Sequence, residues 1–384
     1  MDNFVWYNPT RVVFGRGTIA ALNDLVPKTG TILMVYGGGS IKKNGVYQQV
    51  KKALGKRKVV EFSGIEPNPH YETCMEAVAL ARKSKVSFIL AVGGGSVGDA
   101  SKFISASIKF KGKDPWDIIV KGKPIGDVVP LGCVITLPAT GTEANQNAVI
   151  SRVSTQDKRG FSSDKVRPVF SILDPETTYS LDKRQTANGI VDTFVHVCEQ
   201  YLTYPNAAFL QDRDAEGLLT TLIEIGPKLL KNPDSYDLRA NMMYAAYQGL
   251  DFHLARGVPQ DWTTHNIGHE LTALYGIDHG RSLAVVQPGL WTFDKKRKGA
   301  KLLQYGERVW GITKGSKSER IEAAITQTEK FYNSLGVKTR LKDYGVGPDA
   351  PALVKERLCS RDARLGEYGD ITGVEAEKIL KLRL

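Results

Sequence analysis

Hydrophobic positions along the chain follow two different patterns, one in each half. In the first half, short apolar runs of strand length alternate with stretches in which apolar residues recur at helical spacing. The expected strands span residues 29–36, 58–62, 87–92 and 128–137, and the expected helices span 46–54, 73–83 and 97–109. Strands that are apolar throughout and alternate with helices are typical of a parallel sheet covered on both faces.

The second half shows only helical periodicity. The strand signal stops after Asp174, and apolar residues then recur at a spacing near 3.6. The expected helices span residues 190–201, 207–230, 236–254, 264–275, 320–335 and 374–382. We therefore predict an α/β domain with a Rossmann-like parallel sheet at residues 1–178 and an all-α domain at residues 179–384. The break lies near 174–180, where the Asp-Pro and Thr-Thr pairs disfavour a continuing element.

The composition is that of an ordinary globular protein. The 384 residues are 42% hydrophobic and 24% charged, which excludes a disordered chain, a collagen and a coiled coil. The four cysteines are far apart in the sequence, so no paired zinc or redox motif exists and reduced thiols are expected. No apolar run approaches the ~20 residues of a membrane span, and the first residues lack the pattern of a secretory signal. We expect a cytoplasmic protein with no membrane partner.

The net charge of +11 raises the question of a nucleic-acid partner. The basic residues form short, scattered clusters without interleaved aromatic residues, and no RNA-binding or zinc-finger motif is present. We therefore expect a solvated basic surface and no nucleic-acid partner, and a positive field would also favour a phosphate-bearing cofactor. A basic nucleic-acid-binding protein without enzymatic activity is an alternative, which steeply salt-dependent binding to DNA would reveal.

Two Gly-Gly-Gly-Ser turns, at residues 37–40 and 93–96, each connect an expected strand to an expected helix. In parallel α/β sheets the carboxyl ends of the strands form the ligand crevice, and glycines let the backbone approach a phosphate at a helix N-terminus. Two such turns in one sheet favour a dinucleotide site. Neither turn matches GxGxxG, so tight connections without a ligand are the alternative.

Two further groups of polar residues follow the second glycine turn, one on the next expected helix and one after the next expected strand. Asp99 and Lys102 are three residues apart on the expected helix, where their simplest interpretation is a surface ion pair. Thr140 and Glu143 follow the last apolar run of the first half. They fit either a loop that contacts phosphate or nicotinamide, or a capping box at the start of a helix.

Acidic and histidine side chains gather in two segments of the helical half. Asp192 and His196 are four residues apart on an otherwise apolar helix, and so are His265 and His269 on a later one. His279 follows in an expected loop. Such groups are costly to bury unless they are paired or bound to a metal, so an Asp–His pair that satisfies itself is the alternative. Carboxylate and imidazole donors without a thiolate suit Fe(II) or Zn(II) in a catalytic site.

Taken together, these motifs resemble those of the iron-containing (group III) alcohol dehydrogenases, and within that family the branch of NADPH-dependent aldehyde reductases and butanol dehydrogenases. The resemblance covers essentially the whole chain. The motifs that carry it span residues 64–69, 93–102, 138–143, 174–175, 188–196, 265–269 and 278–280. It implies an N-terminal dinucleotide-binding α/β domain and a C-terminal helical domain, an architecture that is similar to that of dehydroquinate synthases.

The resemblance also implies roles for individual residues. The implied ligands of one divalent metal, Fe2+ or Zn2+, are Asp192, His196, His265 and His279. His269 is implied to lie near the substrate, as a candidate proton relay. The implied cofactor-binding residues are Gly37, Gly38, Gly39, Ser40, Gly94, Gly95, Ser96, Asp99, Thr136, Thr140, Asn145 and Lys158.

The implied reaction is reversible hydride transfer between a nicotinamide and short- to medium-chain aldehydes or primary alcohols, with the metal as a Lewis acid on the substrate oxygen. We predict NADP(H) as the cofactor, because residues 35–43 contain no acid that would bind a ribose 2′-hydroxyl, and their serine and two lysines could receive a phosphate. A lyase of the dehydroquinate synthase-like fold, dependent on NAD and zinc, is the alternative. Relatives are often dimers, so a homodimer is expected, with residues 5–14 as a candidate edge strand.

Overall fold

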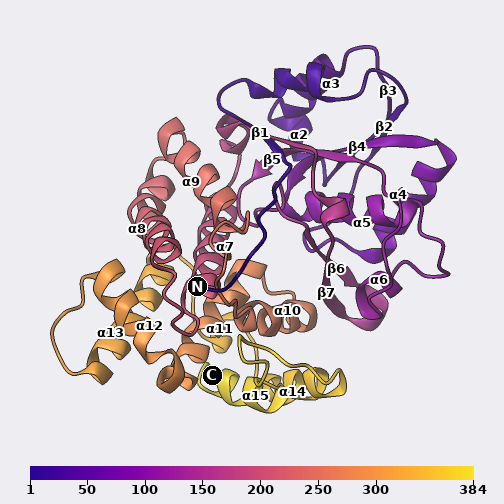
Figure 1. The fold of residues 1–384 in the computed structure, drawn as a ribbon. Coiled ribbons are helices and arrows are strands. Elements are labelled where there is room, and N and C mark those ends of the chain that lie inside the picture. The colour runs from indigo at the N-terminus through magenta and orange to yellow at the C-terminus, as the bar shows by residue number, and fades with distance from the viewer. The chain divides into compact units, whose positions relative to one another are not determined.

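The computed structural model describes residues 1–384, and the first part of the chain is built on a six-stranded parallel sheet (Figure 1). Its strands are β1 (Arg11–Phe14), β2 (Thr31–Tyr36), β3 (Lys58–Phe62), β4 (Val86–Gly94), β5 (Leu131–Leu137) and β8 (Phe170–Leu173). Their order is β1-β8-β5-β4-β2-β3, and all neighbouring strands are parallel. The predicted parallel sheet in an α/β arrangement is therefore confirmed.

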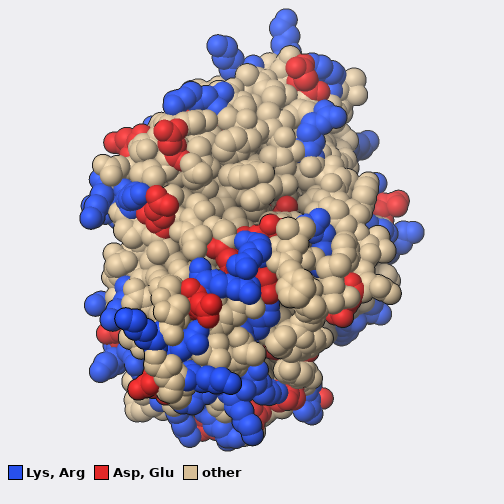
Figure 2. All heavy atoms as spheres, turned by 60° about the vertical axis from the view of Figure 1, so that its left-hand side comes forward, with Lys and Arg blue, Asp and Glu red and all other residues tan.

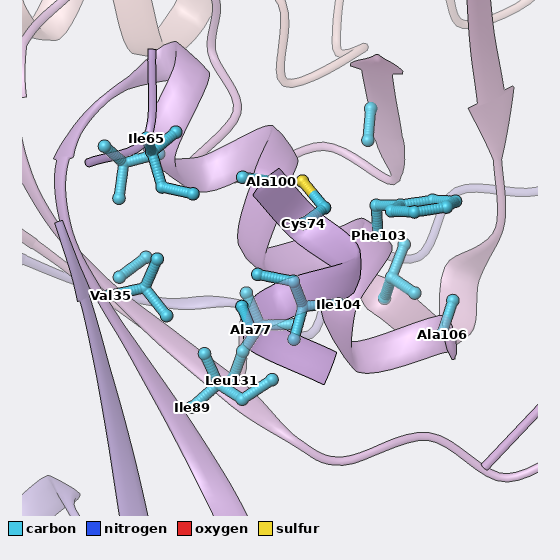
Figure 3. Packing of buried hydrophobic residues seen from close by; sticks show 14 of the residues in the cluster. Val35, Ile65, Cys74, Ala77, Ile89, Ala100, Phe103, Ile104, Ala106 and Leu131 are labelled. Atoms are coloured by element: carbon cyan, nitrogen blue, oxygen red, sulfur yellow. The ribbon is translucent and has the colours of Figure 1, made fainter. Parts of the chain in front are cut away.

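Helices cover both faces of this sheet because successive residues of a strand point to opposite faces. Along β2, Leu33 and Val35 belong to one buried cluster, whereas Ile32 and Met34 belong to another. Figure 3 shows part of the first cluster, where the helical residues Ile104 and Ala77 face the strand residues Ile89 and Leu131. Full burial of an apolar side chain of this size contributes about 1.5–3 kcal/mol. The helices are α1 (Leu22–Leu25), α2 (Ser40–Lys43), α3 (Val46–Leu54), α4 (Tyr71–Lys83), α5 (Gly95–Ile108) and α6 (Asp117–Val120).

An antiparallel hairpin, which the sequence pattern does not predict, lies outside the main sheet. It consists of β6 (Asn147–Arg152) and β7 (Asp157–Ser162). Its inward residues Ala148, Ile150 and Phe161 join the same buried cluster as α5. Apolar residues are few in the hairpin, with three consecutive ones in β6 and only Phe161 in β7, so the strand signal is weak.

The rest of the chain is helical, as predicted. Its helices are α7 (Lys183–Tyr201), α8 (Phe209–Lys231), α9 (Tyr236–Gly249), α10 (Thr263–Tyr275), α11 (His279–Phe293), α12 (Lys295–Trp310), α13 (Lys317–Ser334), α14 (Ala350–Ser360) and α15 (Gly373–Lys381). The sequence pattern does not predict α11, α12 or α14. α11 is buried almost all round and so has no polar face to create a period, and α12 buries two lysines on its inner side.

Contacts between Cα positions divide the chain into two compact units. The sheet unit contains Tyr7–Asp182 and Pro233–Tyr247, and the helical unit contains Met1–Trp6, Lys183–Asn232 and Gln248–Leu384. Most of α9 therefore groups with the sheet unit. None of the helices combines the length and the apolar character that a membrane span requires. On the face seen in Figure 2, Lys and Arg atoms are most numerous in the lower part, with Asp and Glu atoms among them.

Candidate active site

Four side chains of the helical unit converge on one point. Asp192 and His196 project from α7, His265 from α10 and His279 from the start of α11. The Nε2 atoms of the three imidazoles lie 3.5, 3.5 and 3.6 Å from the same oxygen, Oδ1 of Asp192. The rings of His196 and His265 are stacked, with centroids 4.6 Å apart. We refer to these four residues as the donor cluster.

The geometry of the donor cluster fits a metal ion. Bonds of about 2.0–2.2 Å in tetrahedral directions place ligand atoms about 3.4 Å apart, close to the separations from Asp192. Donor atoms of Asp192, His265 and His279 all lie within 4.8 Å of one another. Nε2 of His265 is buried and makes no hydrogen bond. One carboxylate and three imidazoles are donors that both Fe2+ and Zn2+ accept.

Close packing at the start of α11 sets the position of His279. Asp278, directly before it, accepts a hydrogen bond of 2.8 Å from the side-chain amide of Asn188 on α7. A Cβ atom on Gly280 would lie 2.5 Å from the Asn188 carbonyl oxygen, so glycine lets the two helices approach this closely. The prediction that His279 lies in a loop is wrong, because it is the first residue of α11. His279 is therefore held at a closely packed helix start, although its own side chain is only partly buried.

Glu199 supports the donor cluster, although it belongs to none of the predicted site residues. Its Oε1 accepts a hydrogen bond of 2.6 Å from the backbone N–H of Thr264, and its Oε2 accepts one from Nδ1 of His265. A carboxylate on the second ring nitrogen fixes the orientation and tautomer of a metal-binding histidine. The signal that could have found Glu199 is its spacing, because it follows His196 by three residues and so shares a face of α7 with it.

The carboxylates also set the charge of His265. Burial alone would lower the pKa of its imidazole, but Glu199 and Asp192 outweigh burial and raise this pKa to about 9. In the absence of a metal the ring therefore carries a proton at neutral pH, which a metal must displace. Burial raises the pKa of the Glu199 carboxyl, against the opposing effect of His265.

Two further aromatic side chains border the donor cluster. The His269 ring centroid lies 6.1 Å from that of His265 and 5.2 Å from that of His279. Trp262 packs edge-on against His196 and His265, at centroid distances of 6.1 and 5.4 Å. The φ of Trp262 is +59°, a conformation that bulky residues rarely adopt and that is often found near functional sites. His269 thus lies at the edge of the cluster, one turn beyond His265.

In the sheet unit, the first glycine turn lies at a topological switch point. β2 and β4 are neighbours, while the chain leaves β2 for β3 on one side and β4 for β5 on the other. Ligands of open α/β sheets bind outside the strand ends at such a point. A Cβ atom on Gly38 or Gly39 would have no atom within 4 Å, and Gly39 has a φ of +96°. With Gly37 before them and Ser40 after them, these residues present an open backbone surface.

The second glycine turn is packed tightly. A Cβ atom on Gly95 would lie 2.4 Å from the Thr140 hydroxyl oxygen, and one on Gly94 would lie 2.9 Å from Cβ of Leu137. The first turn of α5 therefore lies directly against the loop after β5, where Thr136 is the penultimate strand residue. No helix begins at Thr140, so the capping-box interpretation is wrong.

A hydrogen-bonded chain connects Ser96 to Lys158. The Ser96 hydroxyl oxygen accepts a hydrogen bond of 3.2 Å from the backbone N–H of Asn68. The Asn68 side-chain oxygen in turn accepts a hydrogen bond of 2.7 Å from Nζ of Lys158. The structure thus brings these two predicted cofactor residues together and adds Asn68 between them. Asn68 belongs to the 64–69 motif, but the motif alone assigns it no role.

Asp99 and Asn145 make hydrogen bonds within the protein. The Asp99 carboxylate accepts the Thr142 hydroxyl at 2.7 Å and the Val149 N–H at 2.9 Å. Nζ of Lys102 donates to the Asn145 side-chain oxygen at 2.9 Å. Lys102 is completely buried, so the prediction of a surface ion pair with Asp99 is wrong. Burial lowers the pKa of Lys102 to about 8, although Asp99 opposes this shift.

Comparisons with known proteins agree with one another. Residues 9–175 match the family described as iron-containing alcohol dehydrogenase, and residues 186–382 match the C-terminal part of the Fe-containing alcohol dehydrogenase family. The chain is 55% identical to the NADPH-dependent aldehyde reductase YqhD of Escherichia coli over 375 residues, which is 97% of each chain.

Solved structures give the same result. A crystal structure of YqhD from E. coli K-12 has a TM-score of 0.99 at 52% identity and covers 100% of this chain and 99% of that one. The NADH-dependent butanol dehydrogenase A of Thermotoga maritima has a TM-score of 0.95 at 36% identity, with the same coverage. Proteins of this architecture thus include both NADPH- and NADH-dependent enzymes by their descriptions.

Proposed function

This chain belongs to the iron-containing alcohol dehydrogenase family, and from that premise we propose that it is an NADP(H)-dependent aldehyde reductase and alcohol dehydrogenase. The reaction is reversible hydride transfer between the nicotinamide and short- to medium-chain aldehydes or primary alcohols. The observation that carries the proposal is the convergence of three imidazole Nε2 atoms within 3.6 Å of one Asp192 oxygen. The identity with the NADPH-dependent relative supports the choice of cofactor.

The residues of the donor cluster would hold one Fe2+ or Zn2+ ion. When bound, the metal supplies a Lewis acid that polarises the oxygen of an aldehyde or alcohol. Glu199 keeps the ring proton of His265 on Nδ1, so that Nε2 is available as a donor. The open turn at Gly38 and Gly39 would bind phosphate groups of the cofactor through backbone N–H groups.

His269 is the residue that we propose to move the proton. Reduction of an aldehyde requires a proton at the oxygen that becomes the hydroxyl, and oxidation of an alcohol requires its removal. An imidazole changes its charge near neutral pH, and the His269 ring lies 5.2 Å from that of His279. It is therefore close to the donor cluster without belonging to it.

The lyase alternative is not favoured. Both family matches, and the relatives that the chain resembles, are oxidoreductases by description. A dehydrogenase consumes or forms the reduced nicotinamide with each turnover, whereas a redox-neutral lyase leaves its amount unchanged. The two reactions are therefore separated by absorbance at the wavelength of the reduced cofactor.

We further propose that the protein acts as a cytoplasmic homodimer. β1 is an edge strand of the sheet and pairs only with β8, so its other edge has backbone groups available for a second strand. Phe14, at the end of β1, exposes 40% of its surface. Size-exclusion chromatography with light scattering tests the dimer, and a Phe14→Lys variant tests the edge.

The decisive experiment is metal depletion followed by addition of Fe(II), Zn(II) or Mn(II) singly. NADPH and NADH oxidation would be followed with butanal, for the wild type and for the Asp192→Ala and His269→Gln variants. We expect metal-dependent oxidation of NADPH that is lost in Asp192→Ala together with the bound metal. His269→Gln should keep the metal and lose turnover. Equal activity without metal, or no activity with any aldehyde, would overturn the proposal.

A further inference from the structure

The proposed function requires the protein to distinguish NADP(H) from NAD(H), which differ by one phosphate on the adenosine ribose. In dinucleotide-binding folds an acid about 20 residues after the glycine turn binds the ribose 2′-hydroxyl of NAD. Glu61 occupies that position, because it is the penultimate residue of β3 and follows Gly39 by 22 residues. An acid is therefore present where an NAD-selective site would carry one, outside residues 35–43.

Glu61 is already bound by three donors. Its Oε1 accepts hydrogen bonds from the Tyr47 hydroxyl at 2.8 Å and from Nζ of Lys51 at 3.1 Å. Its Oε2 accepts a hydrogen bond from the Tyr36 hydroxyl at 3.1 Å. Burial alone would raise the pKa of Glu61, but these hydrogen bonds outweigh burial and lower the pKa. The carboxylate is thus ionised, is balanced by Lys51, and has most of its acceptor positions in use.

The same two tyrosines present their rings to Lys42. Its ammonium group lies 5.3 Å from the centroid of each ring, and the rings of Tyr36 and Tyr47 meet edge to face at 6.2 Å. Contacts with two ring faces restrict a lysine side chain that would otherwise be free in solvent. Lys42 belongs to the short helix α2, so this contact holds its charge beside the open glycine turn.

Lys43 provides the contrast. It has the same charge, is the next residue of α2 and is exposed like Lys42, but it lacks the two ring contacts that Lys42 makes. If only the net charge near the turn mattered, the two lysines would contribute equally to phosphate binding. The contacts with the rings of Tyr36 and Tyr47 hold Lys42 alone in place. The structure therefore separates a positioned charge from a merely nearby one.

We propose that Lys42 is the specificity-determining residue that binds the 2′-phosphate of NADP(H), and that Tyr36, Tyr47 and Glu61 position it. Phosphate is a strong acceptor for a charged donor, and the glycine turn leaves room for it beside Lys42. The hydroxyls that bind Glu61 also reduce its repulsion of a phosphate. The inference rests on the proposed dependence on NADP(H).

Binding of adenosine 2′,5′-bisphosphate and of 5′-AMP to the holoenzyme, measured by isothermal titration calorimetry, tests this inference without turnover. The ratio of the two dissociation constants isolates the contribution of the 2′-phosphate. Lys42→Gln should reduce the preference for the bisphosphate by about tenfold to a hundredfold, which is typical for a hydrogen bond to a charged group. Lys43→Gln, the matched control, should change it by less than about twofold, because an exposed and unpositioned charge contributes little.

A second pair of variants tests the positioning residues. Tyr47→Phe keeps the ring and removes one donor from Glu61, so the preference should fall, but by less than in Lys42→Gln. Adding Glu61→Gln to that variant removes the negative charge that has lost a donor and should restore the preference. A merely structural role of Tyr47 would not be rescued in this way.

The outcomes separate the inference from the function on which it rests. A wild-type protein that binds 5′-AMP and the bisphosphate equally well would refute both the NADP(H) dependence and the role of Lys42. A wild type that prefers the bisphosphate, together with a Lys42→Gln variant that keeps the full preference, would overturn only the inference. An equal loss in Lys42→Gln and Lys43→Gln would also overturn it, because charge alone would then be sufficient.

Discussion

Glu199 is expected to control metal affinity although it does not belong to the donor cluster. One of its oxygens caps the start of α10 by accepting the Thr264 N–H at 2.6 Å, and the other accepts Nδ1 of His265. When a metal displaces one proton of the His265 ring, this contact keeps the other proton on Nδ1, so that Nε2, which lies 3.5 Å from Oδ1 of Asp192, is the donor atom. The substitution Glu199→Gln separates the two roles, because an amide has one acceptor oxygen and one donor nitrogen.

After this substitution, the amide oxygen of the new side chain can continue to cap α10, while its amide nitrogen meets a protonated Nδ1. The ring proton must then move to Nε2, the atom that would bind the metal. Loss of such a partner weakens metal binding by about 10- to 100-fold, or about 1.4–2.7 kcal/mol. With metal at about one hundred times Kd, stabilisation by binding would fall from about 2.7 kcal/mol to between about 0.4 and 1.4 kcal/mol.

The assay is competition for the metal with a chelator of known affinity, combined with thermal unfolding in the presence and absence of metal. Glu216→Gln is the matched control, because Glu216 is also buried and hydrogen-bonded, to the Tyr201 hydroxyl at 2.8 Å and to Arg308 at 3.0 Å. It should change stability equally with and without metal. A Glu199→Gln variant whose metal affinity stays within about twofold of the wild type would refute the tautomer argument.

Other predictions concern packing and pH. Gly280→Ala should lower the free energy of unfolding by about 1–3 kcal/mol, because the new Cβ would lie 2.5 Å from the Asn188 carbonyl oxygen. Gly217→Ala, on the exposed face of α8 with no atom within 4 Å, should raise it by about 0.5–1 kcal/mol, and urea unfolding measures both. Burial holds the pKa of Lys102 at about 8 against 10.5 for a free side chain, so between these values the unfolded state binds more protons than the folded state. Stability should therefore rise with pH across this window, and the rise should be smaller in Lys102→Met; parallel pH curves for the two proteins would contradict the shift.

The sheet could be predicted from the sequence because its central strands are buried on both faces. β2 and β4 are almost continuously apolar, and each ends at a glycine turn. The turn marks the end of the strand in the sequence and the start of the helix that follows. α11 could not be predicted by the same reasoning, because burial on all sides removes the polar face that creates a helical period. The sequence pattern consequently places its first residue, His279, in a loop.

The donor cluster could be predicted in part because spacing within one helix is visible in a sequence. Asp192 and His196, four residues apart, must share a face of α7. Glu199 is three residues further along and could have been found by the same rule. The hydrogen bond from Asn68 to Ser96 was beyond this reasoning, because it joins a loop to a helix 28 residues later.

Glu61 and Glu199 both depend on contacts between separate elements, which sequence spacing does not reveal. In the sequence each is an isolated acid, and each obtains its role from partners on other elements. Hydroxyl donors surround Glu61 and reduce its repulsion of a phosphate, whereas Glu199 holds a proton on one nitrogen of His265 so that the other nitrogen can bind a cation. Substitution of either acid by Gln preserves its size and changes only charge and donor pattern. The two Gln variants should therefore alter different properties, cofactor preference in one case and metal affinity in the other, while leaving the packing of the fold intact.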